Sequence, residues 1–160
     1  MRALESEHED QRIHGFPREA DLARFTFKRR ALRANDMAME ILCCGVCHAD
    51  LHQMRNDWGV ASYPLVPGHE IVGRIIEVGA DVRTFHIGDR VGVPWLGWTC
   101  GECGHCRAGR ENLCEQARFT GYQIAGGYAE HMVADARYVF RLPERYSDLE
   151  AAPLLCAGLI

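Results

Sequence analysis

The stretch EIVGRIIEVGA at residues 70–80 predicts a long β-strand with glycines inside it. Isoleucine and valine favour an extended chain, because branched side chains pack well on a pleated surface. Gly73 and Gly79 mark positions where a strand can bulge or bend sharply. Such bends are typical of small curved barrels, so this stretch favours a mainly β fold built on a curved sheet.

Segments on both sides of this stretch extend a pattern of many strands and few helices. Further strands are expected at 24–30, 37–44, 126–135 and 137–142, and a turn followed by a strand is expected within 86–93. A short helix is expected at 47–56, which lacks β-branched residues, and a second within 147–159, where Ser147 fits an N-cap. The two prolines of 63–68 indicate a loop. Residues 1–23 show no clear period, and we expect an irregular segment there.

The composition of the 160-residue chain fits one soluble globular domain, with 48% hydrophobic and 25% charged residues. A net charge of −4 provides no basic face for nucleic acid or an anionic membrane. The polar N-terminus is unlike a secretory signal, and no apolar run is long enough to cross a bilayer. A cytoplasmic protein is therefore expected, and eight cysteines in that reducing compartment favour metal binding over disulfides.

The segment CGECGHCRAGRENLC contains four cysteines with the spacing C-x2-C-x2-C-x7-C, namely Cys100, Cys103, Cys106 and Cys114. It lies in a glycine-rich lobe, residues 95–121, that has no regular period. Four thiolates suit tetrahedral zinc, and a site with four protein ligands is structural because no position stays open for a substrate. An iron–sulfur cluster is the main alternative. His105 lies within the array, either as a ligand or as a solvated loop residue.

Two other stretches, GVCHADLH at 45–52 and PGHEIVGRIIEVGADV at 67–82, contain candidate metal ligands. Each is a weak signal alone, because a Cys–His pair can be coincidence and a His–Glu pair can be an ordinary surface pair. Cys156 lies in the apolar stretch AAPLLCAGLI, and its neighbours alone favour a cysteine that only packs. Spacing alone therefore leaves a second metal site open.

Together these motifs resemble the zinc-dependent alcohol dehydrogenase family. The stretch GHEIVGRIIEVGADV (68–82) fits the family pattern G-H-E-x2-G-x5-G-x2-V at every fixed position. CGVCHADLH (44–52) resembles the loop of the first zinc ligand, and the four-cysteine lobe resembles the family's structural zinc site. The resemblance covers residues 24–160. Its first part, 24–70, looks most like the cinnamyl alcohol dehydrogenase branch, and 93–160 looks more like simple bacterial alcohol dehydrogenases.

The resemblance implies a GroES-like, partly open β-barrel with a zinc-binding lobe and few short helices. The catalytic domain of this kind would occupy residues 24–146, with the structural zinc lobe at 95–121. Residues 147–160 would begin the connection to a Rossmann domain. No G-x-G-x-x-G fingerprint is present in the sequence, so we expect that domain to be absent from this chain. NAD or NADP would bind only with it.

The resemblance also implies a catalytic zinc held by Cys47, His69 and Cys156. Two thiolates, one imidazole and an open fourth position form a catalytic arrangement. Glu70 would approach the metal when water or substrate leaves, and Asp50 would orient the ligand histidine. In the family, this zinc polarises the oxygen of a small alcohol or aldehyde while hydride passes between the substrate and a nicotinamide.

Two histidines take further roles from the resemblance. His48 matches a position that faces the cofactor pyrophosphate, and His52 matches the far end of a proton relay. In the family, a serine or threonine hydroxyl begins that relay two residues after the first ligand. Ala49 stands at this position and has no hydroxyl, so we expect slower proton transfer, a process that contributes typically ~10²–10⁴-fold to rates.

Five other side chains have structural interpretations beside functional ones. Trp58, Trp95 and Leu96 would line a substrate pocket, or they pack within the core or the lobe. Cys43 and Cys44 lie in a strand-like context, and we expect them to be buried structural thiols.

Two classes of function compete with the dehydrogenase. In the first, the chain is a truncated, non-enzymatic zinc-binding remnant in which only the four-cysteine zinc survives. In the second, it is a zinc-lobed nucleic-acid binder, which the acidic balance disfavours. In the family, the chain returns after the Rossmann domain to complete the catalytic domain. Because those strands would be missing here and sheet edges would stay unpaired, we also expect self-association through exposed edges and the C-terminus, or a disordered C-terminus.

Overall fold

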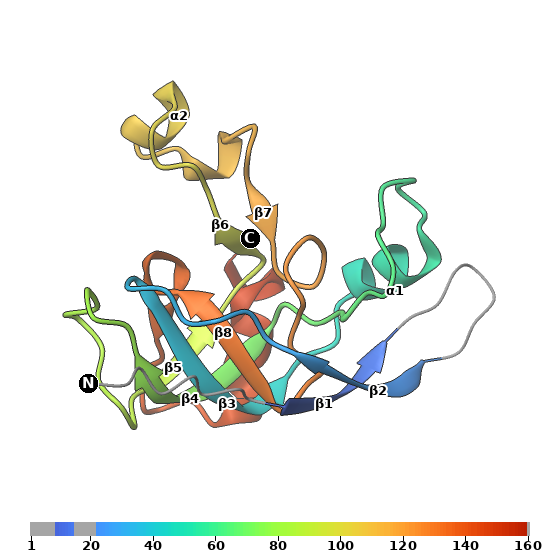
Figure 1. Cartoon of the computed structure of the whole chain (residues 1–160), viewed down its shortest axis with the longest axis horizontal. Helices are drawn as coiled ribbons and strands as arrows, with labels where there is room; N and C mark the ends of the chain where they lie inside the picture. The colour runs from blue at the N-terminus through green and yellow to red at the C-terminus, as the bar shows by residue number, and fades with distance from the viewer. Residues whose placement is uncertain (1–8, 15–21, 160) are drawn as a thin grey trace.

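The computed structural model describes residues 9–14 and 22–159, and its central unit is an open antiparallel sheet (Figure 1). The strand order is β8-β3-β4-β5-β9. These strands are β3 (Asp36–Cys44), β4 (Ile71–Val78), β5 (Arg90–Val93), β8 (His131–Asp135) and β9 (Phe140–Arg141). Every neighbouring pair is antiparallel, and β8 and β9 form the two ends of the sheet. The expectation of a mainly β, partly open barrel is therefore confirmed.

The strand that was expected at 70–80 becomes β4, at the centre of the sheet. Its pairing with β3 contains two shifts of register, the second next to Ile41, which lies opposite Gly73. A Cβ added to Gly73 would lie 2.9 Å from the carbonyl oxygen of Glu40, closer than real Cβ contacts. The glycine therefore permits the close approach of the two strands at this bulge, as the sequence predicts.

The core lies on the concave side of this sheet. Alternate side chains of the strands point into it and are almost completely buried, namely Met37, Met39, Ile71, Ile75, Val91, Val93 and Met132. Each such side chain stabilises the fold by about 1.5–3 kcal/mol relative to leaving it exposed. This core stabilises the sheet, and the sheet supports both cysteine-containing regions.

A two-stranded hairpin precedes the sheet, formed by β1 (Glu9–His14) and β2 (Ala23–Lys28). The strands pair in continuous register from Glu9 opposite Lys28 to His14 opposite Ala23. The expectation of an irregular segment over 1–23 is therefore wrong for 9–14, because pairing with β2, the next strand of the chain, determines its conformation. Residues 1–8 and 15–21 lie outside the described residues.

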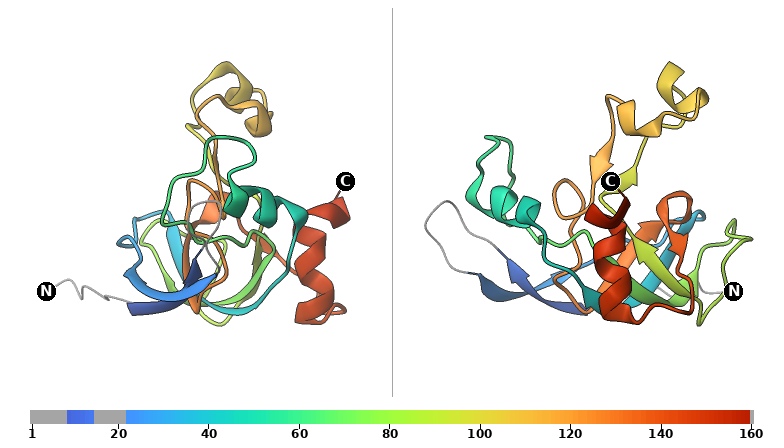
Figure 2. Two further views of the ribbon diagram at one scale, coloured as in Figure 1. Left: turned by 90° about the vertical axis from the view of Figure 1, so that its right-hand side faces the viewer. Right: turned by 180° about the vertical axis from the view of Figure 1, so that it is seen from behind.

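The glycine-rich lobe projects from the body of the protein (Figures 1 and 2). Its stem is a small sheet of β6 (Leu96–Trp98) and β7 (Arg118–Phe119). Its tip contains the short helix α2 (Gly104–Arg107) and the 3-10 turn η1 (Glu111–Leu113). Short elements thus interrupt a segment for which the sequence predicts only a loop-like lobe.

The C-terminal segment packs along the outer side of the sheet (Figure 2). It consists of α3 (Asp148–Ala151), η3 (Ala152–Leu155) and η4 (Ala157–Leu159). Ser147 caps it as expected, since its Oγ accepts from the backbone N–H of Glu150 at 3.3 Å. Leu155 is 5% exposed and fits against Gly92, where a Cβ would lie 2.5 Å from its Cδ2. Regular 3-10 structure continues up to Leu159, and self-association or a disordered C-terminus stays a prediction.

The remaining elements are the helix α1 (His48–Arg55) and the 3-10 turn η2 (Ala136–Tyr138). The helix confirms the expectation at 47–56, whereas η2 replaces the first part of the strand expected at 137–142. Among the described residues, no helix combines the length and apolar character needed to cross a membrane.

Candidate metal centres

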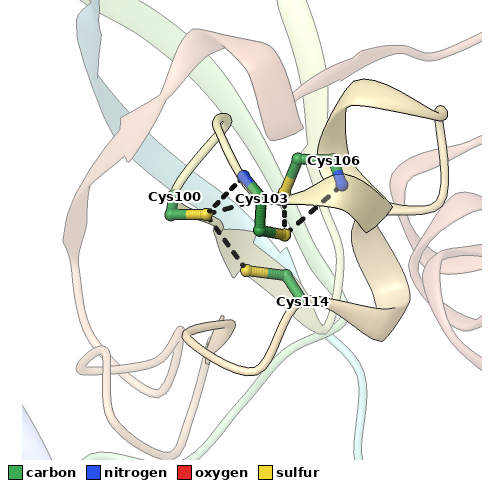
Figure 3. A group of neighbouring side chains, drawn as sticks. All are labelled: Cys100, Cys103, Cys106 and Cys114. Atoms are coloured by element: carbon green, nitrogen blue, oxygen red, sulfur yellow. Dashed lines mark hydrogen bonds between the residues drawn. The ribbon is translucent and has the colours of Figure 1, made fainter.

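The four cysteines of the lobe converge on one point (Figure 3). Cys100 follows β6, Cys103 and Cys106 lie around α2, and Cys114 follows η1. Their four sulfur atoms all lie within 4.8 Å of one another, and all four thiols are free. Gly101 has φ +74, a left-handed conformation that lets the chain turn between the first two ligands. The structure therefore brings all four predicted ligands together.

The sulfur–sulfur distances fit a tetrahedral metal site. Cys103 and Cys106 are 3.5 Å apart, Cys100 and Cys114 are 3.6 Å apart, and Cys100 and Cys106 are 3.9 Å apart. A tetrahedron with zinc–sulfur bonds of about 2.3 Å has edges of about 3.8 Å. Four thiols at these distances can bind a zinc ion without a large rearrangement of the lobe.

The thiols of this cluster differ in acidity before a metal binds. Backbone N–H groups of Glu102 and Cys103 donate to Cys100 and lower its pKa to about 7. The backbone N–H of Cys106 lowers the pKa of Cys103, but burial and the neighbouring thiols outweigh it and raise that pKa to about 11. Cys100 is therefore a thiolate at lower pH than Cys103, and a bound cation would favour the loss of both protons.

A hydrogen-bond chain that the sequence did not reveal supports Cys106. The Oγ1 of Thr99 lies 3.4 Å from the Sγ of Cys106 and 2.5 Å from the hydroxyl of Tyr138. The hydrogen bond between the Thr99 hydroxyl and the Cys106 thiol is the largest cause that lowers the pKa of Cys106. Thr99 is fully buried, so its two partners fix the rotamer of its hydroxyl. In the sequence, only the position of Thr99 immediately before the first cysteine could have indicated this role.

A second cluster assembles from three distant parts of the chain. It contains Cys47, His69, Glu70 and Cys156, each with a possible ligand atom within 4.8 Å of the others. Cys47 is the N-cap of α1, His69 and Glu70 precede β4, and Cys156 follows η3. The sulfur atoms of Cys47 and Cys156 are 4.0 Å apart. All four predicted residues of this site are therefore neighbours.

One ring nitrogen of His69 contacts Asp50, and the other has no hydrogen-bond partner among the described residues. Its Nδ1 lies 3.2 Å from Oδ1 of Asp50, and its side chain is completely buried. Its Nε2 is also buried and has no hydrogen-bond partner among the described residues. A buried unpaired nitrogen costs free energy unless something binds it. A metal ion between His69 and the two thiols would satisfy this atom.

Asp50 connects several residues around this cluster by hydrogen bonds. Its carboxylate accepts hydrogen bonds from the backbone N–H groups of Cys47 and Gly68, both at 2.9 Å, and from the hydroxyl of Tyr128 at 3.1 Å. Burial alone would raise the pKa of Asp50, but the hydrogen bond of His69 and those of the backbone outweigh it and lower the pKa. The ionised carboxylate thus joins the loop of Cys47 to the segment of His69.

Glu70 and Cys156 are less acidic than usual. Burial raises the pKa of Glu70, and burial followed by the charge of Cys47 raises that of Cys156 to about 11. The present position of the Glu70 carboxylate depends on glycine at position 45, because a Cβ there would clash with its Oε2. These groups favour their neutral forms in the metal-free protein, and a bound cation would shift them towards the charged forms.

His52 and His48 lie on α1, outside this cluster. Nδ1 of His52 is 2.8 Å from Oδ2 of Asp57, and its ring is 4.6 Å from the ring of His48, measured between centroids. The ring of Trp58 lies 5.3 Å from that of His52, also measured between centroids. His48 is exposed. The structure therefore leaves both histidines within reach of solvent rather than among the buried ligands.

Trp95 lies against the buried cluster. Its ring is 4.9 Å from that of His69, 6.4 Å from Trp58 and 5.1 Å from Phe119, with which it stacks. Trp95 therefore packs both against the histidine and against the stem of the lobe. Leu96 follows it in β6 and is half-buried.

Three further candidate residues take no part in either cluster. Cys43 and Cys44 are only half-buried rather than buried as expected. Both pack against the core clusters of the sheet, and burial raises the pKa of Cys44 to about 12. His105 lies in α2 and is half-buried, but the four cysteines form the lobe cluster without it.

An open antiparallel sheet that carries a four-thiol lobe defines a GroES-like domain. Comparison with known families agrees, since residues 33–144 match the family described as Alcohol dehydrogenase GroES-like domain. The chain belongs to this family, and the resemblance inferred from its motifs is confirmed.

Curated relatives extend the match over most of the chain. A mannitol dehydrogenase of Petroselinum crispum is 48% identical over 145 residues, which cover 86% of this chain and 43% of that protein. An alcohol dehydrogenase of Geobacillus stearothermophilus is 45% identical over 133 residues, covering 82% and 39%. Plant and bacterial enzymes are thus both similar to this chain.

Solved structures show the same fold. The cinnamyl alcohol dehydrogenase SbCAD4 from Sorghum bicolor superposes with a TM-score of 0.90 at 36% identity, covering 95% of this chain and 46% of that one. A cinnamyl alcohol dehydrogenase from Helicobacter pylori, solved with NADP(H), gives a TM-score of 0.89 at 34% identity and covers the same shares. The chain spans less than half the length of these relatives.

Proposed function

We propose that this chain is the zinc-binding catalytic part of an NAD(P)-dependent alcohol dehydrogenase. Cys47, His69 and Cys156 would hold a catalytic zinc, and the four cysteines of the lobe would hold a structural zinc. The observation that carries the proposal is the buried, unpaired Nε2 of His69 beside two free thiols. Two sulfurs and one imidazole leave a fourth position for a substrate oxygen, as in catalytic zinc sites.

The donor set fits the metal and the chemistry. When bound, zinc would act as a Lewis acid that lowers the pKa of an alcohol or polarises a carbonyl. Asp50 would keep the proton of His69 on Nδ1, so that Nε2 stays available as a ligand. Glu70 is a fourth donor within the same cluster, and would exchange with water or substrate. The ring of Trp95 would shield His69 and form one wall of the substrate site.

His52 is the candidate proton carrier at the surface. The contact of its Nδ1 with Asp57 favours a hydrogen there and leaves Nε2 to accept a proton. Ala49 cannot supply a hydroxyl between the metal cluster and His52, so a water molecule would have to bridge them. Because of this gap, we expect proton release to be slower than in a relative that has a hydroxyl at this position.

The substrates would be small alcohols and aldehydes, and the hydride partner would be NAD or NADP. The support for this is the similarity to mannitol, cinnamyl alcohol and other alcohol dehydrogenases, one of them solved with NADP(H). His48, exposed at the start of α1, would face the cofactor pyrophosphate. Nucleotide binding would require a Rossmann domain beyond the residues of this chain. Self-association through the open sheet edges is a further expectation, measured by light scattering.

Zinc content tests the proposal. We expect two zinc ions per chain in the wild type and one in Cys156→Ser, measured by atomic absorption after exhaustive dialysis. Cys43→Ser is the matched control, because this half-buried cysteine lies outside both clusters, and it should keep two. One zinc in the wild type would instead support a non-enzymatic zinc module, and two in Cys156→Ser would remove Cys156 from the ligand set.

A further inference from the structure

A cavity separate from both metal clusters lies at the base of the lobe. Its volume is about 420 Å³, within the range of small-molecule sites. It is lined by residues of β2, β6, β7 and β8 and by the loops beside them, and by no cysteine. Figure 1 shows β6 and β7, the stem of the lobe, above β8 of the sheet. The dehydrogenase site proposed above does not use this cavity.

The charge of the lining is strongly positive. It includes four arginines and one carboxylate, namely Arg29, Arg30, Arg33, Arg118 and Asp135. The carboxylate of Asp135 is already paired, because its Oδ2 lies 2.7 Å from Nη2 of Arg137. Arg30 pairs with Asp36. The whole chain has a net charge of −4, so this concentration of guanidinium groups is a local feature that attracts anions.

Two of these guanidinium groups are available to a ligand. The side chain of Arg33 is exposed and makes no hydrogen bond or ion pair to any residue within 9–14 and 22–159. Arg118 is also exposed, and its guanidinium lies over the ring of Trp98, 5.5 Å from the centroid, rather than against a carboxylate. Arg29 donates to the carbonyl oxygens of Ala125 and Gly126, which orients its guanidinium.

Apart from Gln123, the rest of the lining is mostly aromatic and apolar. Phe27, Trp98 and Tyr138 contribute rings, and Ile124 and Met132 contribute aliphatic surface. A bare inorganic anion would leave this surface in contact with water. A ligand that combines a flat ring with an anionic group would cover the apolar part and pair with the arginines at the same time.

We propose that this cavity binds a small aromatic carboxylate. The carboxylate would lie between Arg33 and Arg118, both of which present the planar fork that pairs with carboxylates in two hydrogen bonds. The ring would lie against Trp98 and Phe27. The inference is independent of the dehydrogenase proposal, because none of the lining residues belongs to the metal clusters or contacts a substrate there.

Benzoate is the probe, and the tryptophan indole N–H signals in NMR spectra locate it. The chain has three tryptophans, and Trp98 lines the cavity whereas Trp95 lies against His69. Titration of the zinc-loaded protein should shift the indole signal of Trp98, assigned with Trp98→Phe, at concentrations that leave that of Trp95 unchanged. A shift of the Trp95 signal alone would place benzoate at the metal cluster and overturn the proposal.

Charge variants test the role of the arginines. We expect Arg33→Gln and Arg118→Gln each to weaken benzoate binding by roughly three- to tenfold, since each removes one charge-assisted pair. Arg145→Gln is the matched control: it removes the same charge from an exposed site outside the cavity and should change the affinity less than twofold. Equal affinity in Arg118→Gln, Arg33→Gln and the control would overturn the proposal.

Two related probes test the chemistry of the ligand. Benzamide has the ring without the charge, and inorganic phosphate has the charge without the ring. Both should bind more weakly than benzoate if charge and ring act together. Benzamide binding as tightly as benzoate would show that the arginines play no part. Phosphate binding as tightly would show that the aromatic lining plays none, and either result would overturn the proposal.

Discussion

The two cysteine clusters of this protein are assembled in opposite ways. All four thiols of the lobe come from residues 100–114, whereas the second cluster takes its groups from residues 47, 69, 70 and 156. In the lobe, closing a short loop is enough to bring the ligands together. In the second cluster the ligands meet only after β3, β4 and the C-terminal segment have packed. The lobe cluster would thus depend on a bound metal, whereas the second cluster depends on the fold.

Removal of zinc should affect the two regions very differently, and this is the largest expected effect. The lobe contributes little to the main core, so the proposed four-thiolate zinc would supply its stability, with apparent values of roughly 10–16 kcal/mol. After treatment with a chelator, residues 100–114 should lose hydrogen-exchange protection while β3 and β4 keep it. Zinc added back should restore the protection. Retained protection in the lobe would contradict this view of the two regions.

Asp50→Asn should weaken the second cluster alone. The amide cannot accept as the carboxylate does from Cys47, Gly68, Tyr128 and His69 at once. Loss of such a partner lowers metal affinity by about 10–100-fold. Competition with a chromophoric chelator measures it, and the affinity of the lobe should not change. Asp57→Asn, which removes a carboxylate paired with His52 near the surface, should leave both affinities intact.

Thr99→Val should produce a smaller effect, confined to the lobe. The change removes the hydroxyl between Cys106 and Tyr138 and leaves the Tyr138 hydroxyl without this partner, at a cost of about 1–3 kcal/mol. We expect weaker zinc binding by the lobe cluster and an unchanged second cluster. Thr120→Val is a matched control, because the hydroxyl of Thr120 is buried without a partner among the described residues. Equal losses in both variants would argue against a specific role for Thr99.

Glu70→Gln should produce the smallest effect, which depends on pH. Burial raises the pKa of Glu70 in the folded state above its ordinary value of 4.5. The metal-free protein therefore loses stability as pH rises from 4.5 through the folded-state pKa, because ionisation is less favourable in the fold than in the unfolded chain. The glutamine variant should be the more stable of the two at neutral pH, with no such advantage below pH 4.5. Thermal unfolding across this range measures the difference, and a constant difference would rule out ionisation as its cause.

The sequence predicted best what depends on neighbouring residues. The strand at 70–80 and the lobe cluster both follow from local patterns, and the structure brings the four lobe thiols together. Cys156 differs, because its apolar neighbours favoured simple packing and only the family resemblance placed it with Cys47 and His69. No local pattern links residues so far apart in the chain.

Errors arose where other segments of the chain determine the local conformation. The charged stretch at 9–14 has no strand-like period, and pairing with β2 makes it a strand. The strand expected at 126–135 begins only at His131, because Gly126 and Gly127 donate to the carbonyl oxygens of Val66 and Gly68 instead of extending the sheet. Thr99 and Tyr138 were missed for the same reason, since 39 residues separate the two hydroxyls in sequence.

The packing of Leu155 against Gly92 has a thermodynamic consequence for the residue that follows it. With Cys156 as a ligand, docking of the C-terminal segment and metal binding at the second cluster are linked equilibria. Each favours the other by the same free energy, so a weaker Leu155 contact would appear as a lower metal affinity, and an added metal would appear as a more protected segment. A single leucine on the outer side of the sheet would thereby set part of the metal affinity of the cluster that contains Cys47 and His69.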